Sequence, residues 1–585
     1  MTDIDSQART LLAQWRPACA NFDVGVRSSI VALVTTLEQI AQILAQDEEA
    51  RCNLGAISSL WTDLRKLWRD LSRVQLTFWD VDDEEGEGSS KKEKDLRTVC
   101  VSLAKFTRNL VAGVPENQVR AYENEPDIRR LLHYHTSWSA MEDTESVSVA
   151  RMLAQALSNM VTTNEVLMSK LWDTYMNLPE DQVILIRLLA SPDPRTVLTV
   201  LIFILNCIHG SRMRITMLTR TSVGARVCVS LLDNMLKLYD AEEPSVGAQA
   251  FDVGYDILTQ FIEQGLVPDL YGRFAILDEI VTPHQTTLLK IVDSYLQSTQ
   301  MSSVTPATSK TIKIHRKLSP MLAKCFLDLS AYGRKAVEHA LRPPDQSDAS
   351  LPIIEVPASF DDPSTSKPTQ PFQPPVELDV MLPKVCEALV LVTQCIVTVT
   401  LEADHRRADP NQDGTAEPDL KAFFNETCSS GDGVLENLIV THLPPATRAN
   451  ADLLRLLDAF LPRINFGKPV AITPSSAQEA TQHSATADPI GFQYLKRDLV
   501  RLLGILCHGV KAVQDRARAC GGIPVVMNLC VIDERNPYLR EHAIFTLSCL
   551  LKDNRENQAV VDAIKPSVEW DENGVLKNSA GSVGG

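Results

Sequence analysis

The sequence predicts an all-α fold, and three observations lead to that prediction. Two stretches near the C-terminus nearly repeat each other at a fixed period. The residues are 44% apolar but only 6% aromatic, which suits helices packed by leucine, valine and alanine better than a β-sandwich. With 585 residues, the chain is also too long for one compact core of the usual size. An extended array of helical units, or several domains, is therefore expected.

The repeat has a period that is typical of stacked helical units. Residues 494–517 have the sequence YLKRDLVRLLGILCHGVKAVQDRA, and residues 538–561 have the sequence YLREHAIFTLSCLLKDNRENQAVV. Both copies open with Tyr-Leu and carry glutamine at the same place, Gln514 and Gln558, which are 44 residues apart. Repeats of about 40 to 47 residues are found in HEAT and armadillo arrays, whose units stack because none can bury its apolar face alone. We therefore predict an armadillo/HEAT-like α-solenoid, a right-handed superhelix of helical repeats with long disordered loops.

The residues between the two copies indicate how one unit is built. The segment Gly521-Gly522-Ile523-Pro524 breaks the chain, and a new apolar helix is expected at 525–531. Glycine permits a sharp turn, and proline is tolerated in the first turn of a helix, where its missing N–H costs little. Asn536-Pro537 is a second turn signal before the next long helix. This alternation of long and short helices with two turns is the layout of an armadillo unit.

Core and surface positions can be separated within the repeat. Leucines recur at the three-and-four spacing of one helical face, at Leu495, Leu499, Leu502, Leu503 and Leu506. The opposite face carries Arg497, Arg501, Gly504 and His508, and the equivalent positions of the next copy are Glu541, Phe545, Ser548 and Lys552. The ionisable members are Arg497, Arg501, His508, Glu541 and Lys552. Core positions thus stay apolar while face positions change character, as expected where packing repeats and the outer surface specialises. We expect these five face residues to form a mixed-charge strip that binds a peptide or another subunit.

These motifs resemble a known family. The runs GFQYLKRDLVRLLGILCHG, GGIPVVMNLCVIDERNPYLREHAIF and DNRENQAVV closely resemble the C-terminal domain of the ataxin-10 family, an armadillo-like group with fungal members. Residues 103–118, 153–165 and 200–212 resemble successive helical units of that family more loosely. The resemblance implies a non-catalytic helical adaptor, and it implies a role in cytokinesis by similarity to the fungal relatives.

Composition divides the chain into six segments. The first holds N-terminal armadillo-like repeats and a charged, solvated loop at 80–95. The others are a disordered proline-rich insertion, further helical repeats, a disordered linker rich in Ser, Thr and Ala, the ataxin-10-type armadillo-like domain and a polar tail. In chain order the segments are 1–341, 342–375, 376–471, 472–489, 490–565 and 566–585.

Charge argues against nucleic acid as a partner. The net charge is −17, with 74 acidic against 57 basic residues, and this opposes non-specific attraction to phosphate backbones. The basic clusters at 212–226 and 310–317 are sparse and lack the interleaved aromatic residues on which bases would stack. Other proteins are the expected partners, and a repeat surface of this kind would also allow homo-oligomers.

Apolar patterning predicts a cytoplasmic protein without membrane insertion. Residues 1–16 contain Asp3 and Asp5 and lack the apolar core of a secretory signal. The two most apolar runs, 197–208 and 388–401, fall short of the roughly 20 residues of a membrane span and are expected as buried helices. Thirteen scattered cysteines without a Cys-x-x-Cys pair suit a reducing compartment, where they would act as small buried hydrophobes.

Motif searching predicts no enzyme, metal or cofactor. The common phosphate-cradle, dinucleotide, zinc-protease and hydrolase signatures do not occur in the sequence. Asp409, Asn411, Asp413 and Gly414 match the start of an EF-hand loop, but its twelfth position is Leu420, where calcium needs a glutamate. We therefore expect neither a catalytic site nor a bound ion.

Two kinds of protein-binding function remain open. The first is a scaffold that holds partner segments on its helical repeats. The second is an importin-like transport adaptor, because that class is also an acidic helical array that binds basic peptides. Importin-like binding uses a regular ladder of tryptophans on successive helices, whereas the tryptophans of this chain lie at 15, 61, 68, 79, 138, 172 and 570. The scaffold is therefore the preferred prediction.

Overall fold

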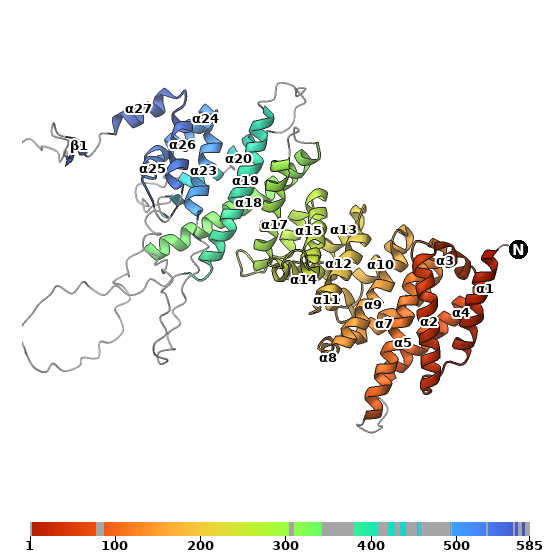
Figure 1. Cartoon of the computed structure of the whole chain (residues 1–585). Helices are drawn as coiled ribbons and strands as arrows, with labels where there is room; N and C mark the ends of the chain where they lie inside the picture. Colours follow the sequence, from red (N-terminus) through yellow and green to blue (C-terminus); the bar gives the residue numbers. More distant parts are fainter. Residues whose placement is uncertain are drawn as a thin grey trace, which may run out of the picture. The chain divides into compact units, whose positions relative to one another are not determined.

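The fold is a succession of short and long helices (Figure 1). The computed structural model describes residues 3–77, 87–302, 309–341, 379–407, 419–426, 433–439, 453–454, 457, 492, 494–533, 536, 538–564, 568–570 and 576–578. Helices make up nearly all of these residues, and they are stacked as repeats. The predicted armadillo/HEAT-like α-solenoid is confirmed. The chain forms two compact units, Met1–Phe274 and Ala275–Gly585.

The first unit consists of helical repeats. Its helices are α1 (Asp3–Ala20), α2 (Arg27–Gln46), α3 (Glu48–Gly55), α4 (Ser58–Thr77), α5 (Glu87–Val111), α6 (Pro115–Ala121), η1 (Tyr122–Asn124), α7 (Glu125–His135), α8 (Trp138–Met141), α9 (Thr144–Val161), α10 (Glu165–Met176), η2 (Glu180–Gln182), α11 (Ile184–Leu189), α12 (Pro194–Ile208), α13 (Arg212–Arg220), α14 (Ser222–Leu238), α15 (Val246–Gln264) and α16 (Val267–Arg273). The long helices α2, α5, α9, α12 and α15 pack side by side in that order. Each repeat therefore adds one long helix to a continuous row.

The turn from each long helix into the next short helix is the same in several repeats. One residue there has a left-handed backbone, with φ between 55° and 74°, at Gly113, Thr163, Gly210, Gly509 and Asp553. Glycine adopts this conformation without steric cost, which explains three of the five positions. The short helix begins two residues later, and Asn164, Ser211 and Asn554 accept a backbone N–H at its first turn.

Amide side chains join successive repeats of this unit. The Nε2 of Gln118 donates to the carbonyl oxygens of Asn159 and Thr162, both at 2.9 Å, and its Oε1 accepts from the Nδ2 of Asn164 at 3.2 Å. Its neighbour Asn117 donates to the carbonyl oxygen of Leu110 at 2.9 Å. The bonds from Gln118 satisfy carbonyl groups at the end of the next long helix, α9, and the bond from Asn117 satisfies one at the end of α5. Carbonyl groups at helix ends lack partners within their own helix.

The charged segment expected as a loop at 80–95 is partly helical. Helix α5 begins at Glu87 and includes the Lys-Lys-Glu-Lys run. These residues have high helix propensity, and Arg97 binds Glu93, one turn earlier, at 2.6 Å. The same arginine reaches Asp143 on the adjoining repeat at 2.8 Å. Propensity and ion pairing thus extend the helix into the segment.

The second unit repeats the row of long helices. Its helices are α17 (Pro283–Ser302), α18 (Ser309–Leu341), α19 (Leu382–Arg407), α20 (Leu420–Asn425), α21 (Val434–Ile439), α23 (Leu495–Cys507), α24 (Lys511–Ala519), α25 (Gly522–Asn528), α26 (Leu539–Leu551) and α27 (Arg555–Ala563). Helices α17, α19, α23 and α26 pack in that order, and α18 packs against α19. The helix expected at 525–531 is α25, which begins three residues earlier and ends at Asn528.

The segment boundaries predicted from composition can be compared with the structure only in part. The insertion at 342–375, the linker at 472–489 and the EF-hand-like residues 409–414 lie outside the described residues. The segment expected as a polar tail contains a small antiparallel hairpin of β1 (Val568–Trp570) and β2 (Leu576–Asn578). Because α18 packs on α19, the helices on both sides of residues 342–375 belong to one unit, and the boundary between units lies at 274.

Two helices of the described residues, α2 and α19, are long and apolar enough to cross a membrane by length and composition alone. A third span would arise if α12 and α13, which meet at a bend of 118°, were counted together. The apolar run at 388–401 is thus part of a 26-residue helix, longer than the sequence suggested. Of its most apolar window, 67% is buried within the structure, where α19 packs on α17, α18 and α23.

Candidate functional site

The two copies of the repeat place their long helices, α23 and α26, in direct contact. A Cβ atom at Gly504 would lie 2.5 Å from the Oγ1 of Thr546 and 3.1 Å from its Cα atom, so only glycine fits there. The Oγ1 of Thr546 also donates to the carbonyl oxygen of Val500 at 2.9 Å. The close approach brings the outer faces of the two helices beside each other.

The predicted core of this pair is confirmed. All five leucines of the first copy are buried, with exposed fractions of 1% or less, at Leu495, Leu499, Leu502, Leu503 and Leu506. The outer face of the pair carries residues that are one repeat apart, and we call it the α23–α26 strip. Its members are Arg497, Arg501, His508, Glu541, Phe545, Ser548 and Lys552.

The side chain of Arg497 is already bound to a neighbouring residue, Asp498. Its guanidinium donates to both carboxylate oxygens of Asp498, at 2.8 and 3.0 Å, and lies 4.2 Å from the ring centre of Tyr494. Asp498 is only 1% exposed and also accepts from the Nε2 of Gln394 on α19 at 3.0 Å. A buried carboxylate needs such partners, so the main role of Arg497 is to neutralise Asp498. Its guanidinium is therefore less accessible to a ligand.

Arg501 and Phe545 lie midway along α23 and α26. They are equivalent positions of the two copies, and the side chain of Phe545 is 51% exposed. Arg501 is half-buried and makes no hydrogen bond or ion pair with the residues that the structure describes. Burial lowers the pKa of the nearby His542, and the charges of Arg501 and Arg497 lower it further.

The other predicted residues lie at the edges of the strip. Glu541 is exposed in the first turn of α26, across from Arg497 in the repeat. His508 and Lys552 are exposed residues that end α23 and α26, and their carbonyl oxygens accept from Lys421 and Gln514 at 2.8 and 3.4 Å. All five predicted residues are at least partly exposed, at equivalent positions of the two copies. Gly504, which the sequence placed on the same face, is instead buried, because α23 lies against Thr546 of α26 at this point.

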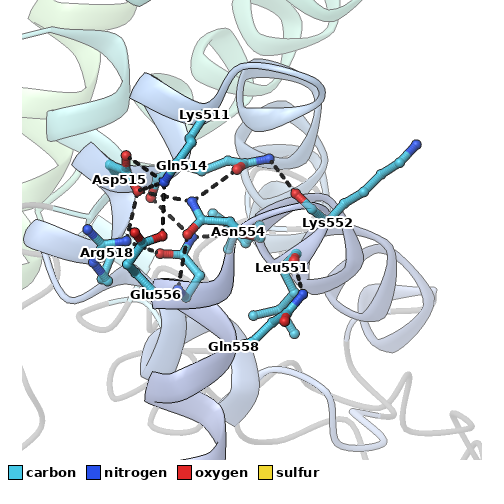
Figure 2. A network of polar contacts seen from close by, with 11 residues as sticks. Lys511, Gln514, Asp515, Arg518, Leu551, Lys552, Asn554, Glu556 and Gln558 are labelled. Carbon is cyan, nitrogen blue, oxygen red and sulfur yellow. Dashed lines mark hydrogen bonds and ion pairs between the residues drawn. The ribbon is translucent and has the colours of Figure 1, made fainter.

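A clasp of amide side chains fixes the register between the two copies (Figure 2). The Nε2 of Gln514 donates to the carbonyl oxygen of Cys549 at 2.8 Å, and its Oε1 accepts from the Nδ2 of Asn554 at 3.1 Å. Asn557 donates to the carbonyl oxygen of Leu550 at 2.7 Å. The same arrangement joins repeats around Gln118 in the first unit. The clasp therefore sets the spacing of the residues on the strip.

Ion pairs surround the clasp. Lys511 lies 3.2 Å from Asp515 and 3.0 Å from Glu556 of the next short helix, as Figure 2 shows. Arg518 lies 2.8 Å from Asp515 and donates to the Oδ1 of Asn557 at 2.6 Å. These exposed contacts add to the buried amide bonds and hold α24 against α27.

Charged residues also lie on α17 and α19, which precede α23 in the row of long helices. Lys290 lies 2.7 Å from Glu387, which joins α17 to α19. Asp293 on α17 is 8% exposed, and its Oδ2 accepts from the Nε2 of Gln297 at 2.7 Å. Burial raises the pKa of Asp293 to about 6, and the nearby charge of Asp498 acts in the same direction. Two buried carboxylates, Asp293 and Asp498, are therefore close enough to affect each other, and Arg497 binds the second of them.

Sequence reasoning missed the residues that support the strip from neighbouring helices. Gln394 and Asp498 are 104 residues apart, and no periodicity joins them. The one available signal was a polar residue inside an apolar helical run, which holds for Gln394 but not for Asp498, since Asp498 follows Lys496 and Arg497. Among the described residues, no group of three His, Cys, Asp or Glu side chains could hold a metal ion.

The C-terminal repeats match a known domain. Residues 495–583 match the Spinocerebellar ataxia type 10 protein domain. The ataxin-10 homolog of Dictyostelium discoideum is 39% identical over 70 residues, which are 12% of this chain and 12% of that protein. Ataxin-10 of Bos taurus is 35% identical over 66 residues, 11% of this chain and 14% of that protein. The resemblance to the ataxin-10 family is confirmed for this domain, which spans only about an eighth of the relatives it matches.

Solved structures with low sequence identity also align with the chain. The crystal structure of SYS-1 covers 97% of this chain and 97% of its own at 12% identity, with a TM-score of 0.32. The crystal structure of Uso1-2 covers 97% of this chain and 91% of its own at 12% identity, with a TM-score of 0.28.

Proposed function

We propose that this chain is a non-catalytic scaffold that binds other proteins through the α23–α26 strip and takes part in the regulation of cytokinesis. The observation that supports the binding face is the pair of Arg501, which is half-buried, and Phe545, which is exposed, at equivalent positions of two long helices that pack together. Arginine and aromatic residues are enriched where protein interfaces concentrate their binding energy. The cytokinesis role follows from the similarity of residues 495–583 to the ataxin-10 domain.

The importin-like alternative has less support. Its tryptophan ladder would need exposed tryptophans on successive repeats, but Trp15, Trp61, Trp68 and Trp172 are at most 2% exposed. They pack inside the first unit. Trp138 is 87% exposed, but it lies on α8, a helix of one turn, and not on a long helix of the row.

The test is a double substitution that leaves the fold intact. Arg501→Glu with Phe545→Ala changes two side chains that hold no described hydrogen bond, whereas reversing Arg497 would set a second carboxylate beside the buried Asp498. We expect tagged protein with the double substitution to lose a defined subset of co-purified proteins, with unchanged helical content by circular dichroism. Cells that rely on this variant should then complete nuclear division but fail to separate.

The matched control is Arg555→Glu, which makes the same change of charge at an exposed position of α27. It should leave the co-purified proteins and cell division unchanged. If the double substitution retains every partner, the strip is not the binding face. If partners are lost but cells divide normally, the binding proposal stands and the role in cytokinesis is removed.

A further inference from the structure

Helix α18 carries a row of positive charges that the α23–α26 strip does not use. Lys313, Arg316, Lys317 and Lys324 are all exposed, and we call them the basic stripe. Their spacing of three, four and seven residues places them on one side of the helix. The opposite side of α18 is buried through residues such as Leu318, Leu322 and Phe326. The basic stripe therefore faces away from the core of the unit.

The stripe has no acidic partner in the described structure. None of its four residues forms a hydrogen bond or an ion pair with a described residue, and no Asp or Glu precedes Asp328 in α18. Acidic residues on the helices that pack near α18 already have basic partners, since Asp404 binds Lys421 at 2.7 Å and Glu436 binds Arg516 at 2.5 Å. The described residues thus leave the positive charge of the stripe uncompensated.

The stripe places four cations without a described acidic partner on one side of a single helix, which is costly for the helix. Lys290 and Lys511, in contrast, have acidic partners within 3.0 Å. Like charges four residues apart, such as Lys313 and Lys317, repel each other and destabilise a helix. Helix formation alone therefore does not explain the stripe.

We propose that the basic stripe is a second docking surface, which binds an acidic segment of a partner protein. From Lys313 to Lys324 the helix rises about 17 Å, a length that five or six extended residues would span. A run with four or more carboxylates over that length matches the stripe in sign and in extent. The distant acidic residues of this chain oppose binding only weakly, because charges more than about 8 Å away are largely screened at physiological salt.

An acidic protein segment fits the stripe better than nucleic acid or a membrane. Single-stranded nucleic acid binding relies on aromatic side chains on which bases stack, and no aromatic residue of the stripe helix is exposed before Tyr332. Helices that lie on membranes insert exposed apolar residues, but no large apolar residue is exposed between Lys310 and Ala340. Lysine ammonium groups, in contrast, attract carboxylates without demanding one geometry.

The test measures binding of the full chain to a labelled peptide of six consecutive glutamates. The neutral control is a peptide of six glutamines. We expect fluorescence anisotropy to report binding of the glutamate peptide alone, and the binding should weaken as salt is raised. Lys313→Glu, Lys317→Glu and Lys324→Glu together should lower the affinity by at least about tenfold. Exposed lysines have little effect on folding, so circular dichroism should be unchanged.

The matched control reverses three exposed lysines outside the stripe, Lys91, Lys237 and Lys384, with the same change in net charge. It should keep most of the affinity. Equal losses in both triple variants, or equal binding of the glutamine peptide, would overturn the proposal. Tighter binding of single-stranded DNA or phosphatidylserine vesicles than of the glutamate peptide, at the same ionic strength, would also overturn it in favour of that class of partner.

Discussion

Single amide side chains set the distance between repeats at both ends of the chain. Gln118 and Gln514 each donate to carbonyl oxygens at the end of the following long helix and accept from the asparagine that caps the next short helix. Gln558 is equivalent to Gln514 in sequence, but it is exposed and bonds to the carbonyl oxygen of Leu551 within its own repeat. A glutamine at this position therefore bonds to the next repeat where a described repeat follows, as at Gln514, and bonds within its own repeat where none follows, as at Gln558.

The clasp gives the first prediction. Gln514→Ala should lower the free energy of unfolding by about 1 to 3 kcal/mol, because it leaves buried carbonyl and amide groups without partners. The control Gln558→Ala removes an exposed bond and should change stability by less than about 0.5 kcal/mol. Urea unfolding of both variants measures the difference. Equal effects would show that the buried clasp does not stabilise the packing of the repeats.

The contact at Gly504 gives the second prediction. Gly504→Ala should destabilise the second unit by about 1 to 3 kcal/mol, because the new methyl group meets Thr546 at 2.5 Å and the two long helices must separate. Gly333→Ala is the control, since a Cβ atom there meets nothing within 4 Å. That substitution should be neutral, or stabilise α18 by up to about 1 kcal/mol through helix propensity. A thermal melt of each variant decides between these outcomes.

Asp293 gives the third prediction, which concerns pH. Its pKa is raised by burial from 3.8 to about 6, so the folded chain binds this proton more tightly than the unfolded chain. The stability that it contributes is complete below pH 4 and is lost as the pH rises through 6. Asp293→Asn should therefore stabilise the protein at pH 7.5, by at most about 3 kcal/mol, and have no effect below about pH 4.

The control for this prediction is Asp328→Asn, at an exposed position of α18. It should give the same stability difference from the wild type at every pH between 4 and 7.5. Chemical unfolding across that range measures both variants. A constant difference for Asp293→Asn as well would contradict the assigned cause, which is the burial of its charge.

At the scale of helices, apolar spacing predicted the elements well where one face is buried. The leucine pattern of α23 and the 44-residue period correctly located the two long helices and their core. Helix starts were predicted less well. Helix α5 extends into a charged segment because of local propensity, and α25 begins before its proline, which the first turn of a helix tolerates.

For the candidate strip, repeat spacing predicted the positions of its residues but not the contacts that they make. The period alone placed Arg497, Arg501 and Glu541 on one face, because equivalent positions of stacked repeats must point the same way. Whether a residue on this face is free to bind a partner protein depends on its contacts with distant parts of the chain. Arg497 is occupied by Asp498, which Gln394 of α19 also binds, and neither contact follows from repeat spacing.

At the scale of the whole molecule, the chain consists of two compact units built by the same rule. In each unit a row of long helices is formed by contacts between neighbouring repeats. Arrays of this kind gain their stability from the repeats themselves and from nearest-neighbour interfaces. Because the first unit ends at residue 274, we expect residues 1–274 to fold without the rest of the chain.

The fourth prediction follows from that organisation. A fragment of residues 1–274 should be helical by circular dichroism and should unfold cooperatively in urea. As a control, a fragment of residues 1–200 cuts through α12 and removes the helices that cover it, so it should unfold at lower urea concentration. An unfolded 1–274 fragment would show that the first unit depends on the rest of the chain.

The most direct test of the protein-binding face is site-specific photo-crosslinking in cells. A benzophenone amino acid would replace Arg501 or Phe545 in the strip, or Ala512, which is exposed on α24 outside the strip. We expect both strip positions to crosslink to the same protein and the Ala512 position not to do so. Identical products from all three positions, or no product from either strip position, would contradict the assignment of this face as the binding surface.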